Sequence, residues 1–161
     1  MAFTIVNDGS TDDSNKLGAI GDLHLVITKE NVDDDLIVVA GDNLFSNSLE
    51  DFGKFCRQKN APVLATYDVG SLEQVKKYSS ISIDQQGRIV AFEEKPKPER
   101  LRDIGRSIPS GATFARHTDE QPFMASMGIY VFSRDILLEM LEREQGLDFG
   151  RELIPNALSK Y

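Results

Sequence analysis

The sequence predicts an α/β fold, in which helices pack on a β-sheet, within a single domain that covers residues 1–161. Two observations predict it. Short apolar runs alternate with helical patterns through the first half of the chain, as expected when strands and helices follow each other in an α/β sheet. The composition is also that of a globular domain, with 161 residues, of which 40% are hydrophobic and 27% charged.

The strongest strand signal is the run Asp35–Ala40, in which the last five residues are all apolar. An uninterrupted apolar run of this length predicts a strand buried on both faces, as is typical of parallel sheets. Ile89–Glu94 is joined to the strand before it through Gly87, which predicts a hairpin turn. The expected strands are Phe3–Val6, Asp35–Ala40, Pro62–Tyr67, Ser80–Asp84, Ile89–Glu94 and Met127–Phe132.

Apolar residues spaced three and four apart predict the helices. Ser48 is a candidate N-cap for the helix expected over Ser48–Asn60. Pro155 requires a first-turn position or a kink in the helix expected over Gly150–Lys160. Cys56 falls on the apolar face of the second helix and is expected in the core. The segment Pro96–Pro122 has few apolar residues, and we interpret it as a long loop. The expected helices are Lys16–Lys29, Ser48–Asn60, Asp135–Arg143 and Gly150–Lys160.

The charge and cysteine content exclude several classes of protein. Eighteen basic and 26 acidic residues give a net charge of −8, which disfavours a nucleic-acid binder because such proteins need a basic face. One cysteine, Cys56, allows no internal disulfide and fits a cytoplasmic location. We expect no signal peptide, and no membrane protein, because no apolar run approaches the roughly 20 residues that span a bilayer.

The first candidate site is Gly41-Asp42-Asn43, directly after the strongest strand. Ligands of α/β sheets bind beyond the carboxyl ends of the strands. There Gly41 could let the backbone approach a ligand, and the Asp42 carboxylate is a hard oxygen ligand suited to Mg²⁺. An Asx turn without function explains the same residues equally well.

The second candidate is Glu93-Glu94-Lys95, at the end of a strand. A lysine at this position could lie beside a phosphate while a carboxylate accepts hydrogen bonds from sugar hydroxyls. On the residues alone, the favoured interpretation is the solvated end of an edge strand, where mixed charges are common.

The third candidate is Asp148-Phe149-Gly150. Asp148 could cap the helix that follows, or it could be a second carboxylate that converges with Asp42 on a metal ion. The triplet also occurs in protein kinases, but this chain has no His-Arg-Asp loop and no kinase glycine loop. A P-loop and a dinucleotide fingerprint are absent as well.

Taken together and in this order, these motifs resemble those of the sugar-1-phosphate nucleotidyltransferases. Segments Ala125–Phe132 and Asp148–Pro155 are similar to segments of the family members that form ADP-glucose. Leu17–Gly21 resembles the turn and helix start with which the wider family contacts the nucleobase. The resemblance implies a Rossmann-like mixed sheet, incomplete at the N-terminus. It also implies Mg²⁺-dependent transfer of a nucleotidyl group from a nucleoside triphosphate to a sugar-1-phosphate. ATP is the expected donor, and glucose-1-phosphate is the expected acceptor.

The resemblance assigns roles to residues of this chain. Asp42 and Asp148 would hold Mg²⁺, and Lys95 would contact the sugar phosphate. The substrate-binding residues would be Gly18, Gly41, Glu94, Lys95, Ser126 and Gly128, with Asp42 and Lys95 as the catalytic residues.

Four departures accompany the resemblance. No glycine-rich triphosphate loop precedes Phe3, Ser79 stands where many members have glycine, and no C-terminal β-helix follows. Residues up to about Pro96 also resemble generic members of the family, whereas the chain from Phe123 onward resembles the members that form ADP-glucose, and the loop between them matches neither well. We therefore keep two alternatives open, a non-catalytic module that binds a sugar phosphate or nucleotide sugar, and an inactive fragment that self-associates. The expected partners are a nucleoside triphosphate, a sugar-1-phosphate, and either further copies of the chain or a second chain that supplies the missing segment.

Overall fold

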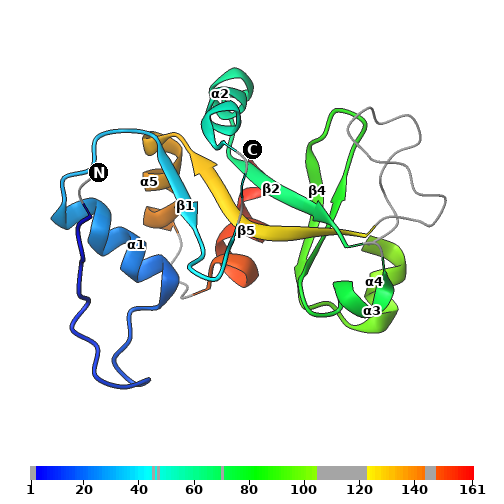
Figure 1. The fold of residues 1–161 in the computed structure, drawn as a ribbon, viewed down its shortest axis with the longest axis horizontal. Helices are drawn as coiled ribbons and strands as arrows, with labels where there is room; N and C mark the ends of the chain where they lie inside the picture. The colour runs from blue at the N-terminus through cyan, green and yellow to red at the C-terminus, as the bar shows by residue number, and fades with distance from the viewer. Residues whose placement is uncertain (1–2, 45, 47, 70, 105–122, 144–147) are drawn as a thin grey trace.

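Figure 1 shows the computed structural model of the chain, which describes residues 3–44, 46, 48–69, 71–104, 123–143 and 148–161. None of the helices in these ranges has both the length and the apolar composition needed to cross a bilayer. The elements in chain order are α1 (Gly18–Lys29), β1 (Leu36–Val39), α2 (Glu50–Lys59), β2 (Val63–Asp68), α3 (Leu72–Val75), β3 (Ser79–Ile83), β4 (Ile89–Glu94), α4 (Pro98–Ile104), β5 (Met124–Phe132), α5 (Arg134–Arg143), the π-helical turn η1 (Phe149–Leu153) and α6 (Ile154–Ala157).

The five strands form one sheet organised around β5, the longest strand, and the α/β prediction is confirmed. β1 and β2 both pair with Tyr130 and Val131 of β5, so they lie on opposite sides of it. Both are antiparallel to β5 and therefore run in the same direction as each other, with α2 connecting them. The N-terminal end of β5 also pairs with β3, which forms a hairpin with β4.

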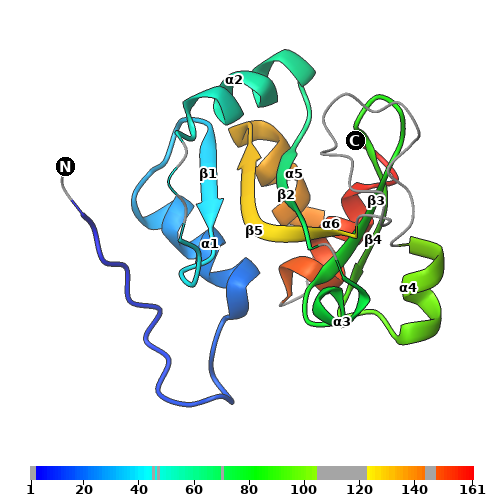
Figure 2. The same cartoon turned by 45° about the vertical axis from the view of Figure 1, so that its right-hand side comes forward.

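The main core lies on one face of the sheet. In both views α5 and α6 lie behind the strands, whereas α3 and α4 lie beside the β3–β4 hairpin (Figures 1 and 2). Phe132, Leu137 and Leu153 are fully buried in the main core, and a smaller cluster forms around Val75 and Leu101. Burying an aromatic or leucine side chain stabilises a fold by about 1.5–3 kcal/mol.

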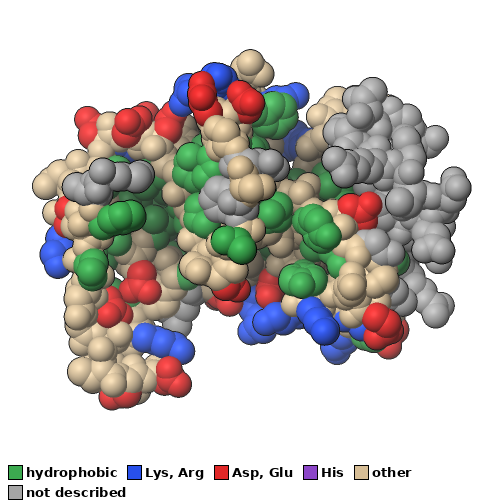
Figure 3. All heavy atoms as spheres, in the orientation of Figure 1, with side chains coloured by type: hydrophobic (Ala, Val, Ile, Leu, Met, Phe, Trp, Pro, Cys, Tyr) green, Lys and Arg blue, Asp and Glu red, His purple; other side chains and the backbone are tan. Residues whose placement is uncertain are grey.

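The expectation that the strand over residues 35–40 is buried on both faces is wrong. Along β1, Leu36 and Val38 pack against the core, whereas Ile37 and Val39 are 44% and 39% exposed. An apolar run cannot by itself distinguish a strand covered on both faces from one covered on a single face. Hydrophobic side chains are accordingly visible over the strands in the space-filling view (Figure 3).

The structure differs from the sequence predictions in the N-terminal segment, in the predicted loop and in the last helix. Phe3–Val6 forms no strand, and Phe3 and Ile5 are 88% and 93% exposed, because no neighbouring strand pairs with them in the described residues. α4 forms within the predicted loop, whose residues 105–122 lie outside the described ranges. The last predicted helix is a π-helical turn followed by the short α6, with Pro155 in its first turn as the sequence required.

Candidate functional site

The turn after β1 carries the predicted residues Gly41 and Asp42. The backbone N–H and the side-chain Nδ2 of Asn43 both donate to the carbonyl oxygen of Ala40, each at 3.1 Å, and this closes the turn. Asp42 is exposed, and the space around Gly41 is open, with no atom within 4 Å of the position that a Cβ would take. The turn therefore satisfies its own backbone and leaves the Asp42 carboxylate facing solvent.

Gly128 holds this turn against β5. Its φ of +67° is in the left-handed region that favours glycine, and its carbonyl oxygen accepts a 2.9 Å hydrogen bond from the Ala40 N–H. A Cβ on Gly128 would lie 3.2 Å from the Ala40 Cβ and 3.5 Å from the Asn43 Nδ2. The Gly128 N–H donates to the Ser126 hydroxyl oxygen at 3.1 Å. Ser126 and Gly128 thus form a local distortion of β5 next to the Asp42 turn.

The two consecutive glutamates of β4 face opposite sides of the sheet, as alternation along a strand requires. Glu93 lies opposite Ser80 and accepts a 3.1 Å hydrogen bond from the Arg100 guanidinium, Nε to Oε2. Glu94 lies opposite Ser79 and accepts a hydrogen bond from its hydroxyl. Of the two carboxylates, only Glu94 is thereby directed toward the other predicted site residues.

Lys95 follows β4 directly, in an unusual backbone conformation. Its φ is +45°, one of the few positive values among the described non-glycine residues, and the residue before a proline normally prefers extended geometry. Its side chain is 62% exposed, and its Nζ lies 3.8 Å from Glu94 Oε1. The turn at the end of β4 therefore directs the Lys95 ammonium alongside Glu94 and into solvent.

Asp148 caps the turn η1, as the structural interpretation of the sequence predicted. Its Oδ1 accepts from the Arg151 N–H at 2.9 Å, and its own N–H donates to Glu152 Oε2 at 2.9 Å, a reciprocal arrangement like a capping box. A carboxylate has about four acceptor positions, so capping does not use up its capacity. Asp148 can therefore act as a cap and still present an oxygen to a ligand.

Gly150 brings β4 and η1 together. A Cβ at Gly150 would lie 3.1 Å from Glu94 Oε2 and 3.6 Å from Asp148 Oδ1, so the two carboxylates approach the same point. Burial raises the pKa of the neighbouring Tyr130 phenol, a hydrogen bond with Ser126 opposes the shift, and the charges of Glu94 and Asp148 raise it further. The phenol therefore stays protonated beside this acidic pair.

The structure thus brings together some of the predicted residues. Glu94, Lys95 and Asp148 gather at one place. Ala40 and Asn43, which flank Gly41 and Asp42 in the turn, lie against Gly128, and Ser126 lies between the two groups through its bonds to Gly128 and Tyr130. In both views, the end of α1 that begins at Gly18 points to the same end of the sheet as the carboxyl end of β1 (Figures 1 and 2).

The chemistry of the donors fits Mg²⁺, although the described residues do not form a complete cage. No three His, Cys, Asp or Glu side chains within the described ranges could hold a metal ion together. Mg²⁺ is usually held by one or two carboxylates, with substrate phosphates and water completing the octahedron. Asp42 and Asp148 are both exposed, so a site of this kind requires the phosphate ligand. The metal role of the two residues stays a prediction.

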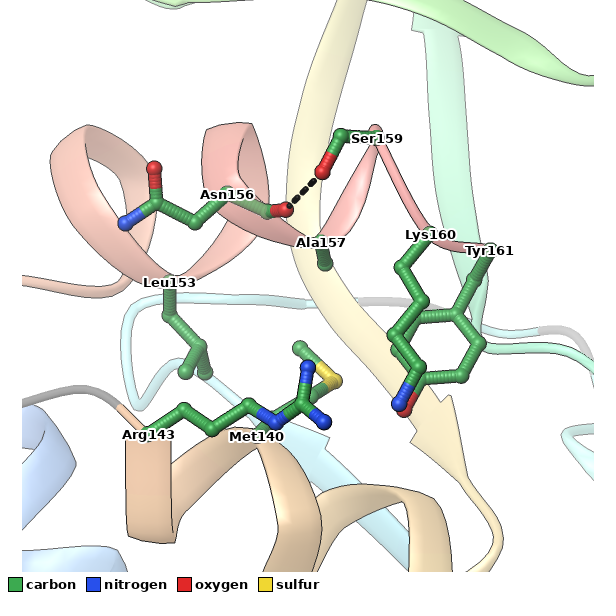
Figure 4. A pocket seen from close by; sticks show the side chains of 8 residues that line it. All are labelled: Met140, Arg143, Leu153, Asn156, Ala157, Ser159, Lys160 and Tyr161. Atoms are coloured by element: carbon green, nitrogen blue, oxygen red, sulfur yellow. Dashed lines mark hydrogen bonds between the residues drawn. The ribbon is translucent and has the colours of Figure 1, made fainter.

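A hollow elsewhere in the molecule is not part of this site. It lies between α5 and the C-terminal residues, has a volume of about 120 Å³, and is lined by Met140, Lys160 and Tyr161 among others (Figure 4). Pockets that hold drug-sized ligands occupy roughly 300–1,000 Å³. The Lys160 ammonium and the Tyr161 hydroxyl both donate to Glu139, so the polar groups here serve to fasten the C-terminal segment.

Three residues at the site were not predicted from the sequence as ligands: Ser79, Tyr130 and Gly150. Counting the hairpin pairs regularly outward from Gly87 would place Ser79 opposite Glu93. The structure places it opposite Glu94 because the register of the hairpin shifts between Ser82 and Ile83. Gly150 belongs to the candidate triplet Asp148-Phe149-Gly150 and Tyr130 to the segment Ala125–Phe132. The sequence does not reveal the contacts of either residue, because these depend on how η1 packs against the sheet.

Comparison with known proteins supports one family. The family described as nucleotidyl transferase matches residues 4–161. The chain is 35% identical over 126 residues to the glucose-1-phosphate adenylyltransferase small subunit, chloroplastic/amyloplastic, of Triticum aestivum. That alignment covers 76% of this chain and 26% of the wheat protein. The chain thus spans about a quarter of the length of this relative.

Proposed function

The chain belongs to the nucleotidyl transferase family, and we propose that it acts in the transfer of a nucleotidyl group from a nucleoside triphosphate to a sugar-1-phosphate. The observation that carries the proposal is the convergence of Glu94, Lys95 and Asp148, beside the distortion of β5 that holds the Asp42 turn. The similarity to a glucose-1-phosphate adenylyltransferase favours ATP and glucose-1-phosphate as the substrates.

In the proposed reaction an oxygen of the sugar-1-phosphate attacks the α-phosphorus of the triphosphate. A new P–O bond forms, the bond from the α-phosphorus to the β-phosphate oxygen breaks, and pyrophosphate leaves with the electron pair. The Lys95 ammonium would lie against the attacking phosphate and offset its charge. Asp42 and Asp148 would hold Mg²⁺, which offsets the charge of the triphosphate when it is bound.

The remaining residues would position the substrates. Glu94 would accept hydrogen bonds from sugar hydroxyls, and Ser126 and Gly128 would line the sugar pocket. Gly18 and Gly41 would let the backbone approach the nucleotide and its phosphates, for which the open space beside Gly41 leaves room. Alignment of two polyanions is the main requirement of this chemistry, because holding reactants together removes much of the entropic barrier.

Pyrophosphorolysis tests the proposal. The purified chain is incubated with Mg²⁺, pyrophosphate and a panel of nucleotide sugars, and the nucleoside triphosphate formed is measured. We expect ATP from ADP-glucose, and we expect Asp42→Asn to lose this turnover. Asp51→Asn is the matched control, because Asp51 is an exposed aspartate on α2. Full activity of the Asp42 variant contradicts its metal role. A folded chain that yields no triphosphate from any nucleotide sugar contradicts the catalytic proposal.

A further inference from the structure

The carboxylate of Glu94 is restrained on one of its two oxygens. The register of the β3–β4 hairpin places Ser79 directly opposite Glu94, and the Ser79 hydroxyl donates to Oε2. Ser79 is 9% exposed, and the Glu94 side chain is 21% exposed. A hydrogen bond between a hydroxyl and a carboxylate in such a partly buried place is among the stronger kinds in proteins.

Gly150 lies next to the same oxygen. A Cβ there would lie 3.1 Å from Glu94 Oε2, closer than most real Cβ contacts. The backbone of η1 therefore approaches Oε2 as closely as it does because residue 150 has no side chain. Ser79 and Gly150 come from elements distant in the sequence, and they act on one atom.

The other oxygen, Oε1, is the one that faces the Lys95 ammonium, at 3.8 Å. Oε2 is engaged by Ser79, so Oε1 is the oxygen that lies on the side of Lys95. If a ligand placed its phosphate at Lys95, a hydroxyl group next to that phosphate could donate a hydrogen bond to Oε1.

We infer that Ser79 and Gly150 are positioning residues, which fix Glu94 so that Oε1 accepts a hydrogen bond from a sugar hydroxyl while Lys95 binds the phosphate. This inference rests on the proposed function, because it assumes a sugar phosphate as the ligand. It makes Ser79 a determinant of sugar recognition that acts through Glu94 without touching the phosphate. A free Glu94 carboxylate would rotate, and the sugar would have to restrain it on binding.

A merely structural role for Ser79 makes a different prediction. If its bond to Glu94 only stabilised the hairpin, losing it would lower the stability of the fold and affect all ligands alike. If it positions Glu94, losing it weakens the binding of a sugar phosphate but leaves the binding of inorganic phosphate unchanged, because inorganic phosphate has no sugar hydroxyl to contact Oε1.

Titrations followed by NMR separate the two roles, since the chain has a mass of 17.9 kDa. The probes are glucose-1-phosphate and inorganic phosphate. We expect Ser79→Ala to weaken glucose-1-phosphate binding about tenfold, as for the loss of one hydrogen bond to a charged group. Inorganic phosphate should bind as before, and Ser79→Thr, which keeps the hydroxyl, should restore the affinity.

Ser82→Ala is the matched control. Ser82 is also a buried serine of β3, 6% exposed, but its hydroxyl donates to the carbonyl oxygen of Ile104 on α4. It should change the affinity for neither probe. Gly150→Ala tests the same atom from the side of η1 and should weaken glucose-1-phosphate binding selectively, which keeps the test available if the Ser79→Ala variant does not fold.

The outcomes distinguish this inference from the proposed function. If the Ser79→Ala variant is folded and binds glucose-1-phosphate as tightly as the unchanged chain, or loses both probes equally, the positioning role is wrong and the proposed function stands. If the unchanged chain is folded and binds no glucose-1-phosphate, while a nucleotide sugar still yields triphosphate, then the sugar assignment and the positioning role both fail. If it neither binds nor turns over, the proposed function fails too.

Discussion

The backbone of Lys95, at the end of β4, has a positive φ, and two substitutions test whether this conformation is strained. We compare Lys95→Gly with Lys95→Ala. Both changes remove the ammonium and its 3.8 Å approach to Glu94, so the difference between them reports on the backbone alone. A non-glycine residue with φ near +45° is held in a conformation that only the surrounding structure maintains.

The magnitude follows from two opposing terms. Relief of the left-handed conformation favours glycine by about 1–2 kcal/mol. The extra freedom of glycine in the unfolded chain opposes this by about 0.4–1 kcal/mol. We therefore expect the glycine variant to be more stable than the alanine variant by about 0.5–1 kcal/mol, which for a chain of this size corresponds to a difference in Tm of roughly 1–4 °C.

Thermal and urea unfolding measure this difference, and titration with glucose-1-phosphate measures the accompanying loss of affinity, which should be the same for both variants. Asn60 offers a control, because it has a φ of 50° at the end of α2. Changing Asn60 to glycine or to alanine should show the same order of stability without affecting the ligand. An alanine variant of Lys95 as stable as the glycine variant would refute the reasoning that the backbone is strained.

Three further predictions concern neighbouring positions. The Ser80 hydroxyl is fully buried and has no hydrogen-bond partner among the described residues, so Ser80→Ala should leave the free energy of unfolding unchanged or raise it by up to about 1 kcal/mol in urea unfolding; a clear loss of stability would contradict this. Gly128→Ala should destabilise by about 1–2 kcal/mol, because it puts a side chain at a φ of +67° with a Cβ 3.2 Å from that of Ala40; an unchanged urea midpoint would show that β5 adapts. Burial raises the pKa of the Tyr130 phenol, so the folded chain binds this proton more tightly than the unfolded chain, and the free energy of unfolding falls as the pH rises above the ordinary value of about 10. Tyr130→Phe should reduce that fall when unfolding is measured between pH 8 and 11. If the free energy of unfolding depended on pH equally in the two proteins, the burial effect would be contradicted.

The sequence predicts well those elements whose pattern is local. The β3–β4 hairpin follows from two short runs and Gly87, whose φ of +79° is the turn geometry that glycine favours. The helices α1, α2 and α5 follow from apolar spacing, and each begins within two residues of its expected start. Cys56, expected in the core, is indeed buried.

The features that depend on distant neighbours were not predicted. Phe3–Val6 has the composition of a strand, yet a strand forms only where another one pairs with it, and composition does not reveal the partner. Ser48 was expected to cap α2 directly. The helix instead begins one residue later, after Leu49, while the Ser48 hydroxyl still accepts from the Glu50 N–H at 3.2 Å.

The candidate site shows the same division. Asp148 was recognised both as a cap and as a possible ligand, and the structure shows why the two roles are compatible, because the cap places its carboxylate beside Glu94. That proximity depends on Gly150, because a side chain at this position would lie next to a carboxylate oxygen of Glu94 on β4. The sequence does not show this contact. The identity of a site residue can be inferred from its chemistry, but the room that its neighbours leave for it comes only from the packing of η1 on the sheet.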